Sequence, residues 1–224
     1  MTLPRAAKGI LLGPIYMSDE PLRQRVGVFG GTFDPIHLGH LLIAEQSREQ
    51  LRLDQVRFIP AAIAPHKQGR QSADAKHRVE MIRLAIGGNP HFCVDERELK
   101  RGGTSYTVDT LRELTSEMPD AELFFLMGAD SLADLHTWRE PQAICQLAFV
   151  AIIARGGQPL PDLQQLVRFL PAAQCEALTS HLVQMPQLEI SSTDIRDRVE
   201  SGKSIRYLVP AAVEAYLMHH AVYQ

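Results

Sequence analysis

From residue 25 onward, short apolar runs rich in β-branched and aromatic residues alternate with longer segments whose apolar positions recur every three or four residues. The short runs are typical of buried strands, and the longer segments have the period of amphipathic helices. The predicted strands cover residues 25–29, 56–61, 91–96, 122–128, 147–154 and 182–188. Strands that alternate with helices in this way predict a parallel sheet with crossover helices.

The helical segments strengthen this interpretation of the fold. Helices are predicted at residues 41–51, 75–86 and 107–117, and in the C-terminal segment that opens with Pro210 in its first turn. The third helix should end before Pro119, because proline cannot continue a helix, whereas Pro210 stands where a helix tolerates it. We therefore expect an α/β fold: a Rossmann-like doubly wound parallel sheet with flanking helices and a small C-terminal helical part.

The length of the chain favours one domain. Its 224 residues suffice for one large α/β domain but not readily for two. Residues 1–24 lack the pattern of the rest, so we expect an N-terminal extension followed by a single domain at 25–224. Gly13 and Pro14 interrupt the short apolar stretch of the extension and no cleavage pattern follows, so no signal peptide is expected.

Composition and charge narrow the class of protein. With 45% hydrophobic and 22% charged residues, the chain has the composition of a globular protein, and no apolar run approaches the roughly 20 residues of a membrane helix. The net charge of -3 offers no general attraction to nucleic acid. Cys93, Cys145 and Cys175 fit neither a disulfide framework nor a zinc site. We expect a cytoplasmic protein without membrane or nucleic-acid partners.

The first candidate site is the segment FGGTFDPIHLGH, which lies between the first strand and the first helix. Gly30 and Gly31 fall at the carboxyl edge of the sheet, where open α/β sheets bind ligands. Glycines there let backbone N–H groups approach a phosphate, and the helix start adds partial positive charge. His37 and His40, with Gly39 between them, should point to the same side of the helix. The pattern favours two donors for one anion.

Two other interpretations of the histidines are weaker. A metal site could combine His37, His40 and His66, but no carboxylate or cysteine lies nearby at ligand spacing. Two histidines that only fill a core would be unusual at a helix start behind two glycines. We therefore predict phosphate binding and no metal site made by the protein.

A second candidate site is ISSTDIR at residues 190–196, directly after the last predicted strand. Ser191, Ser192 and Thr193 can cap the helix that begins here. They also leave hydroxyl and N–H groups directed outward, with Arg196 one turn further on, and such a group suits a triphosphate tail. We expect both roles.

Two further segments carry candidate chemistry. The loop AIAPHKQG places His66 and Lys67 after the second strand, where the residues alone leave open whether Lys67 is a solvated charge or has a function. The segment GADSLADLHTW ends in Trp138, the only tryptophan of the chain. A lone tryptophan usually belongs to the core or a surface anchor, but beside nucleotide motifs it can stack on a flat ring. A pyridine ring would suit it.

The motifs resemble a known family. GTFDPIHLGH is similar to the signature of the HxGH nucleotidylyltransferases, and the ordered series SYTVDTL, GADSL, LxxW and IRYLVPAAVEAYL resembles the bacterial nicotinate mononucleotide adenylyltransferases from about Val26 onward. The resemblance implies transfer of AMP from ATP, with Mg²⁺, to nicotinate mononucleotide, giving nicotinate adenine dinucleotide and pyrophosphate in NAD biosynthesis. Transfer to nicotinamide mononucleotide or phosphopantetheine, or a non-catalytic nucleotide sensor, stays open, and so does a homo-oligomer.

The resemblance also implies roles for individual residues. The catalytic residues implied are His37, His40, Lys67 and Arg196. The ATP-binding residues implied are Gly30, Gly31, Thr32, Phe33, Gly39, Gly128, Asp130, Ile190, Ser191, Ser192 and Thr193. The mononucleotide-binding residues implied are Thr32, Lys67, Tyr106, Thr107, Trp138 and Arg139. Asp109 is expected to support its helix, and Ala64 stands where the family's PPHK loop has its first proline.

Overall fold

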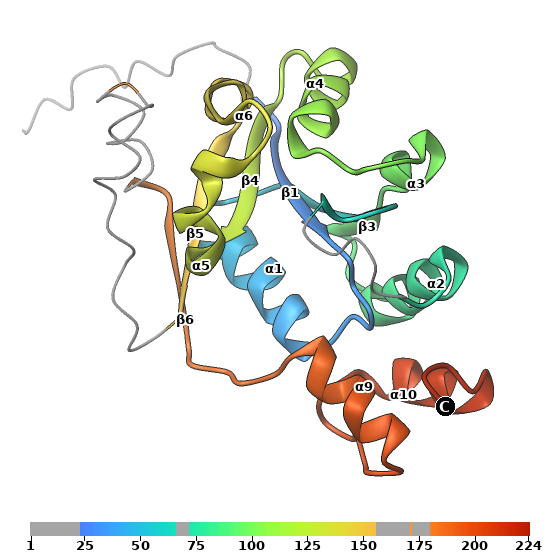
Figure 1. The fold of residues 1–224 in the computed structure, drawn as a ribbon. Helices are drawn as coiled ribbons and strands as arrows, with labels where there is room; N and C mark the ends of the chain where they lie inside the picture. The colour runs from blue at the N-terminus through green and yellow to red at the C-terminus, as the bar shows by residue number, and fades with distance from the viewer. Residues whose placement is uncertain (1–22, 66–71, 156–170, 172–179) are drawn as a thin grey trace, which may run out of the picture.

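A computed structural model describes residues 23–65, 72–155, 171 and 180–224 (Figure 1). Within these residues, six parallel strands form one sheet in the order β3-β2-β1-β4-β5-β6. The strands are β1 (Arg25–Gly31), β2 (Gln55–Pro60), β3 (Phe92–Val94), β4 (Glu122–Gly128), β5 (Phe149–Arg155) and β6 (Leu182–Met185). All six predicted strands and the doubly wound α/β fold are confirmed. Most of the predicted N-terminal extension, residues 1–22, lies outside the described residues.

The helices lie on both faces of this sheet. They are α1 (Leu38–Gln50), α2 (Ala75–Ile86), α3 (Arg97–Arg101), α4 (Thr107–Glu117), α5 (Ala129–Ala133), the 3-10 helix η2 (Leu135–Thr137), α6 (Pro141–Leu147), α9 (Ser192–Glu200) and α10 (Ala211–His219). The bounds of α2 and α4 are those predicted. The apolar period predicted α1 from residue 41, but the helix begins at Leu38, where the segment with His37 and His40 had indicated a helix start, because His37 caps it. Pro210 caps α10 rather than lying in its first turn. Among the described helices, none is long and apolar enough to span a membrane.

The sheet separates two apolar layers. Leu123, Phe125 and Met127 of β4 pack with residues of α4, α5 and α6, whereas Phe124 and Leu126 pack with residues of α1, α2, α9 and α10. Successive residues of a strand point to opposite faces, so both faces of β4 are buried, as is usual in parallel sheets. Figure 1 shows α9 and α10 together at one end of the molecule.

The topology places a ligand site at the middle of the sheet. β1 and β4 are neighbours, but the chain leaves β1 toward β2 and β3 and leaves β4 toward β5 and β6. The connections therefore diverge at the carboxyl ends of β1 and β4, and open α/β sheets bind ligands at such a switch point. Gly31 and Gly128 end these two strands.

A buried polar cluster holds the segment before α4. Glu98 of α3 is only 6% exposed, and Thr110 of α4 donates its hydroxyl to Glu98 Oε1 at 2.6 Å. Ser105 also hydrogen-bonds Glu98, and its Oγ accepts the backbone N–H of Ala62 at 2.9 Å. Burial raises the pKa of Glu98 above its ordinary value. The cluster therefore joins α3, α4 and the loop after β2 through one carboxyl group.

The raised pKa of Glu98 predicts a pH-dependent stability. The folded protein disfavours the ionised carboxylate, so wild-type stability should fall relative to Glu98→Gln as the pH rises above the ordinary pKa of 4.5. The difference should level off above the raised pKa of the folded state. Urea unfolding of both proteins from about pH 4 to about pH 8 measures this difference. A difference that does not change with pH would contradict the prediction.

Candidate active site

The turn between β1 and α1 holds two stacked histidines. His37 is the N-cap of α1, and the ring centroids of His37 and His40 lie 3.6 Å apart with 24° between the ring planes. His37 Nδ1 accepts the backbone N–H of His40 at 3.3 Å, and His40 Nδ1 accepts that of His37 at 3.2 Å. Because each Nδ1 is an acceptor, each neutral ring carries its proton on Nε2. The pair therefore presents two Nε2–H donors from one helix start.

Two residues next to the histidines, Gly39 and Phe33, shape their surroundings. A Cβ atom at Gly39 would lie 3.0 Å from two atoms of the His37 ring, so any larger residue at this position would press on the histidine. Phe33 is buried, has a positive φ of 50°, and packs edge-on against His40 with 5.1 Å between centroids. At Gly30, by contrast, an added Cβ would meet no atom within 4 Å. Gly30 therefore faces open space beside the histidines.

The start of α9 is in contact with this turn. Ser191 caps α9 with its side chain, Ser192 Oγ donates to the backbone carbonyl of Pro35 at 2.9 Å, and Arg196 Nη1 donates to that of Asp34 at 2.6 Å. Figure 1 shows the first turns of α1 and α9 side by side. The two segments predicted to share a phosphate site are thus brought together by direct hydrogen bonds.

Asp34 is the centre of a buried polar group. It is 6% exposed, and its Oδ1 accepts the Tyr223 hydroxyl at 2.5 Å and the backbone N–H of Ala73 at 3.1 Å. The Arg196 guanidinium lies 3.8 Å from Oδ2. Asp34 therefore links the turn, α9, the start of α2 and the segment after α10.

A buried arginine completes this group from α2. Arg78 is only 2% exposed and donates to the backbone carbonyls of Thr32 at 2.9 Å and Ala73 at 3.1 Å. Burial lowers its pKa, although the nearby carboxylate of Asp34 acts in the opposite direction. Arg78, Asp34 and Tyr223 were not assigned by sequence reasoning. The sequence signal for Arg78 was that a charged residue directly precedes Val79, which belongs to the apolar face of α2.

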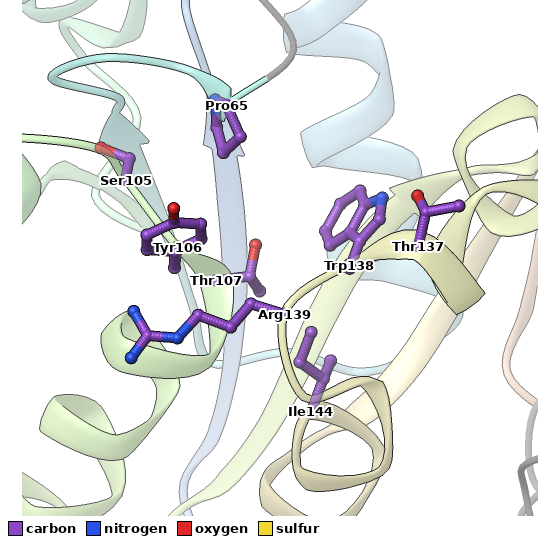
Figure 2. A pocket seen from close by; sticks show the side chains of 8 residues that line it. All are labelled: Pro65, Ser105, Tyr106, Thr107, Thr137, Trp138, Arg139 and Ile144. Atoms are coloured by element: carbon purple, nitrogen blue, oxygen red, sulfur yellow. The ribbon is translucent and has the colours of Figure 1, made fainter.

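A separate cavity lies at the start of α4. It measures about 120 Å³, well below the roughly 300–1,000 Å³ of a whole small-molecule site, so it suits one part of a ligand. In Figure 2, Tyr106 and Trp138 face this space from opposite sides. The lining residues are Pro65, Ser105, Tyr106, Thr107, Thr137, Trp138, Arg139 and Ile144. The predicted mononucleotide residues Tyr106, Thr107, Trp138 and Arg139 thus line one cavity.

Two walls of the cavity are held by aromatic and ionic contacts. Trp138 packs edge-on against Phe125 of β4, with 6.0 Å between ring centroids. The Arg139 guanidinium lies 4.7 Å from the centroid of the Tyr106 ring and donates to Asp109 Oδ2 at 3.2 Å. Asp109 lies in the first turn of α4, so it both supports the helix and orients Arg139.

The remaining predicted residues divide into three groups. Gly128 caps α5 and Asp130 lies in its first turn, at the carboxyl end of β4. Ile190 packs against the core, and the Cβ of Ile190 would lie 3.9 Å from a Cβ added at Gly39. Lys67, like His66, lies outside the described residues.

Comparisons with known proteins identify the relatives of this chain. Residues 28–198 match a family model described as cytidylyltransferase-like. A probable nicotinate-nucleotide adenylyltransferase of Thermomicrobium roseum is 48% identical over 89% of this chain and 92% of the relative. One of Thermus thermophilus is 45% identical over 89% of this chain and all of the relative.

Solved structures share the fold. The nicotinic acid mononucleotide adenylyltransferase of Plasmodium falciparum, complexed with NaAD, aligns with a TM-score of 0.70 at 18% identity, covering 90% of this chain and 98% of that one. At that identity the likeness supports the fold alone. From the family model and the curated relatives, the chain belongs to the cytidylyltransferase-like proteins and, among them, to the nicotinate-nucleotide adenylyltransferases.

Proposed function

We propose that this protein transfers AMP from ATP to nicotinate mononucleotide, forming nicotinate adenine dinucleotide and pyrophosphate. The main support is the contact between the start of α9 and the turn that leads into the His37 and His40 pair, where Ser192 and Arg196 donate to backbone carbonyls of the turn. The names of the close relatives agree with this reaction. We further propose that residues 25–224 form one domain and that the protein acts in the cytoplasm.

The reaction needs no base on the protein. The phosphate of the mononucleotide is already an anionic nucleophile, so its oxygen attacks the α-phosphorus of ATP directly. The bond from the α-phosphorus to the bridging oxygen breaks, and the electron pair leaves with pyrophosphate. Catalysis then consists of aligning the two substrates and stabilising charge on the phosphate oxygens.

The phosphate site offers donors of several kinds. His37 and His40 can offer Nε2–H groups at one helix start, and Arg196 adds a permanent positive charge near the other. Both helix starts carry partial positive charge. We assign Lys67 to the same phosphates, from the resemblance of its loop.

The glycines and the segments around them complete the proposed ATP site. Gly30 faces open space and admits a phosphate close to the backbone. We assign the ATP-binding role to Gly31, Thr32, Phe33 and Gly39 of the turn, to Gly128 and Asp130 at the start of α5, and to Ile190, Ser191, Ser192 and Thr193 at the start of α9.

Mg²⁺ is proposed to arrive with ATP. The carboxylate of Asp34 in this site is already hydrogen-bonded to Tyr223 and Ala73, and the other groups described there are mostly donors. This donor set fits an ion that keeps much of its water and is bound chiefly through substrate phosphates. When bound, the ion would neutralise charge on the phosphate oxygens.

The cavity at α4 suits the pyridine ring of the acceptor. Tyr106 and Trp138 offer flat faces, and α4 begins at Thr107 beside the cavity, so its first N–H groups can receive a carboxylate. A carboxylate gains more from a helix start than a neutral amide does. This asymmetry favours nicotinate over nicotinamide as the acceptor.

One assay tests the proposed reaction against its alternatives. The protein is incubated with ATP and Mg²⁺ beside nicotinate mononucleotide, nicotinamide mononucleotide or phosphopantetheine, and pyrophosphate release is measured. We expect the fastest release with nicotinate mononucleotide. Faster release with another acceptor would reassign the substrate, and no release with any acceptor would favour a nucleotide sensor.

His40→Ala should lower kcat by at least about 100-fold, because it removes one donor to the charge that develops in the transition state. It also removes a capping hydrogen bond of α1, so the free energy of unfolding should fall by about 1 kcal/mol. Steady-state kinetics and chemical unfolding separate the two effects. His91→Ala is the matched control, since His91 is exposed at the opposite edge of the sheet. A folded His40→Ala protein with near-normal kcat would contradict the assignment.

Trp138→Ala should raise the KM for nicotinate mononucleotide by about 10-fold, with a smaller change in kcat. Stacking binds the ground state and the transition state alike, so its loss appears mainly in KM. Trp138→Phe keeps an aromatic face and should show a smaller rise. If the KM for ATP rises instead, Trp138 belongs to the ATP subsite.

A further inference from the structure

Tyr223 joins the active-site turn to a distant part of the sequence. It follows α10 and is 189 positions from Asp34, yet its hydroxyl donates to Asp34 Oδ1 at 2.5 Å. Its ring is partly buried and packs against the apolar layer that also contains Phe33 and Ile195. The Tyr223 hydroxyl therefore contacts the turn between β1 and α1.

Asp34 forms hydrogen bonds through both its carboxylate and its backbone carbonyl. Its carboxylate is held by Tyr223 and by the backbone N–H of Ala73, while its backbone carbonyl accepts from Arg196 at 2.6 Å. A rotation of the Asp34 residue would therefore move the carbonyl that anchors the Arg196 guanidinium. The position of the Arg196 guanidinium therefore depends on how the Asp34 carboxylate is held.

The charge of Asp34 adds a second reason for this arrangement. A carboxylate beside a triphosphate repels it unless its charge is compensated. The Arg196 guanidinium, 3.8 Å from Oδ2, and the nearby Arg78 offset this charge, while the Tyr223 hydroxyl donates a hydrogen bond to Oδ1. Burial, together with the hydrogen bond to Asp34, raises the pKa of Tyr223, so the hydroxyl keeps its proton and remains a donor.

We propose that Tyr223 is a positioning residue of the phosphate site, which holds Asp34 so that Arg196 is directed at the triphosphate of ATP. The ligand named here rests on the proposed function. The competing explanation is that Tyr223 only fastens the segment after α10 to the rest of the fold. The two explanations differ in which substrate a conservative substitution affects.

Tyr223→Phe tests this, because it keeps the packed ring and removes only the hydroxyl. We expect the Kd for Mg-ATP to rise about 5- to 10-fold, since a donor to a charged group is misplaced, while the Kd for nicotinate mononucleotide changes by less than about 2-fold. Calorimetry measures both. Equal weakening of both substrates, or no change in the Kd for Mg-ATP, would overturn the proposal.

Tyr216→Phe is the matched control. Tyr216 lies in α10, and its hydroxyl contacts His77 Nδ1 of α2 at 2.9 Å without reaching Asp34. It should lower the Tm about as much as Tyr223→Phe but leave the Kd for Mg-ATP unchanged. If the Kd for Mg-ATP rises equally in Tyr216→Phe and Tyr223→Phe, weaker attachment of the C-terminal segment explains the effect of both substitutions. That result would overturn the proposal.

A double-mutant cycle tests the route through Arg196. In an Arg196→Ala protein, Tyr223→Phe should produce no further rise in the Kd for Mg-ATP, whereas a full additional rise would overturn the proposal. Inorganic tripolyphosphate provides a readout independent of turnover. If the wild-type protein transfers no AMP but Tyr223→Phe weakens tripolyphosphate binding, the proposed function fails and the positioning role stands. If the wild-type protein binds no tripolyphosphate, the positioning role fails.

Discussion

The site depends on the docking of α9 onto two backbone carbonyls, those of Asp34 and Pro35. Ser192 and Arg196 donate to these carbonyls, and through them a helix from the end of the fold is set against the turn after β1. Without this docking, Ser192 and Arg196 would lose these partners, and no hydrogen bond of theirs would hold the start of α9 against the turn. The topology makes the turn available, since it lies where the connections from β1 and β4 diverge.

Two buried polar groups lie at this docking site and a third lies near the start of α4, and each has hydrogen-bond partners. Arg78 donates to backbone carbonyls of the turn, Asp34 accepts from Tyr223, and Glu98 accepts hydroxyl groups near the start of α4. A buried charge without partners would cost several kcal/mol, so such groups specify one arrangement of the segments they join. Those segments lie at the proposed phosphate site or beside the cavity at Tyr106 and Trp138.

The sequence predicted the elements that are long and regular. α2 and α4 were predicted with their bounds because two or more turns show the helical period, whereas α3, α5 and α6, with five to seven residues, are too short for it. Strand ends were less accurate: residue 147 ends α6 rather than starting β5, and β6 stops at Met185. Interactions between distant segments compete with local pattern at such ends.

The residues of the candidate site also differ in whether a local sequence pattern indicates them. His37, His40 and the ISSTDIR segment could be proposed from the sequence because local spacing carries their chemistry, and the structure brings the two segments into contact. Tyr223 was missed because the spacing of residues along the chain indicates only which face of an element a residue occupies. It does not indicate a contact with a residue 189 positions away. The Nδ1 contacts of the histidines were also unpredictable, since they depend on the dihedral angles of the turn.

The adjacent starts of α1 and α9 have a thermodynamic consequence. Both carry partial positive charge, so their closeness leaves an unfavourable electrostatic energy in the empty protein that a bound anion would remove. Ligand binding and folding are then linked, and a nucleotide at about 100 times its Kd would stabilise the fold by about 2.7 kcal/mol. The cellular nucleotide supply thus becomes one of the variables that sets the protein's resistance to unfolding.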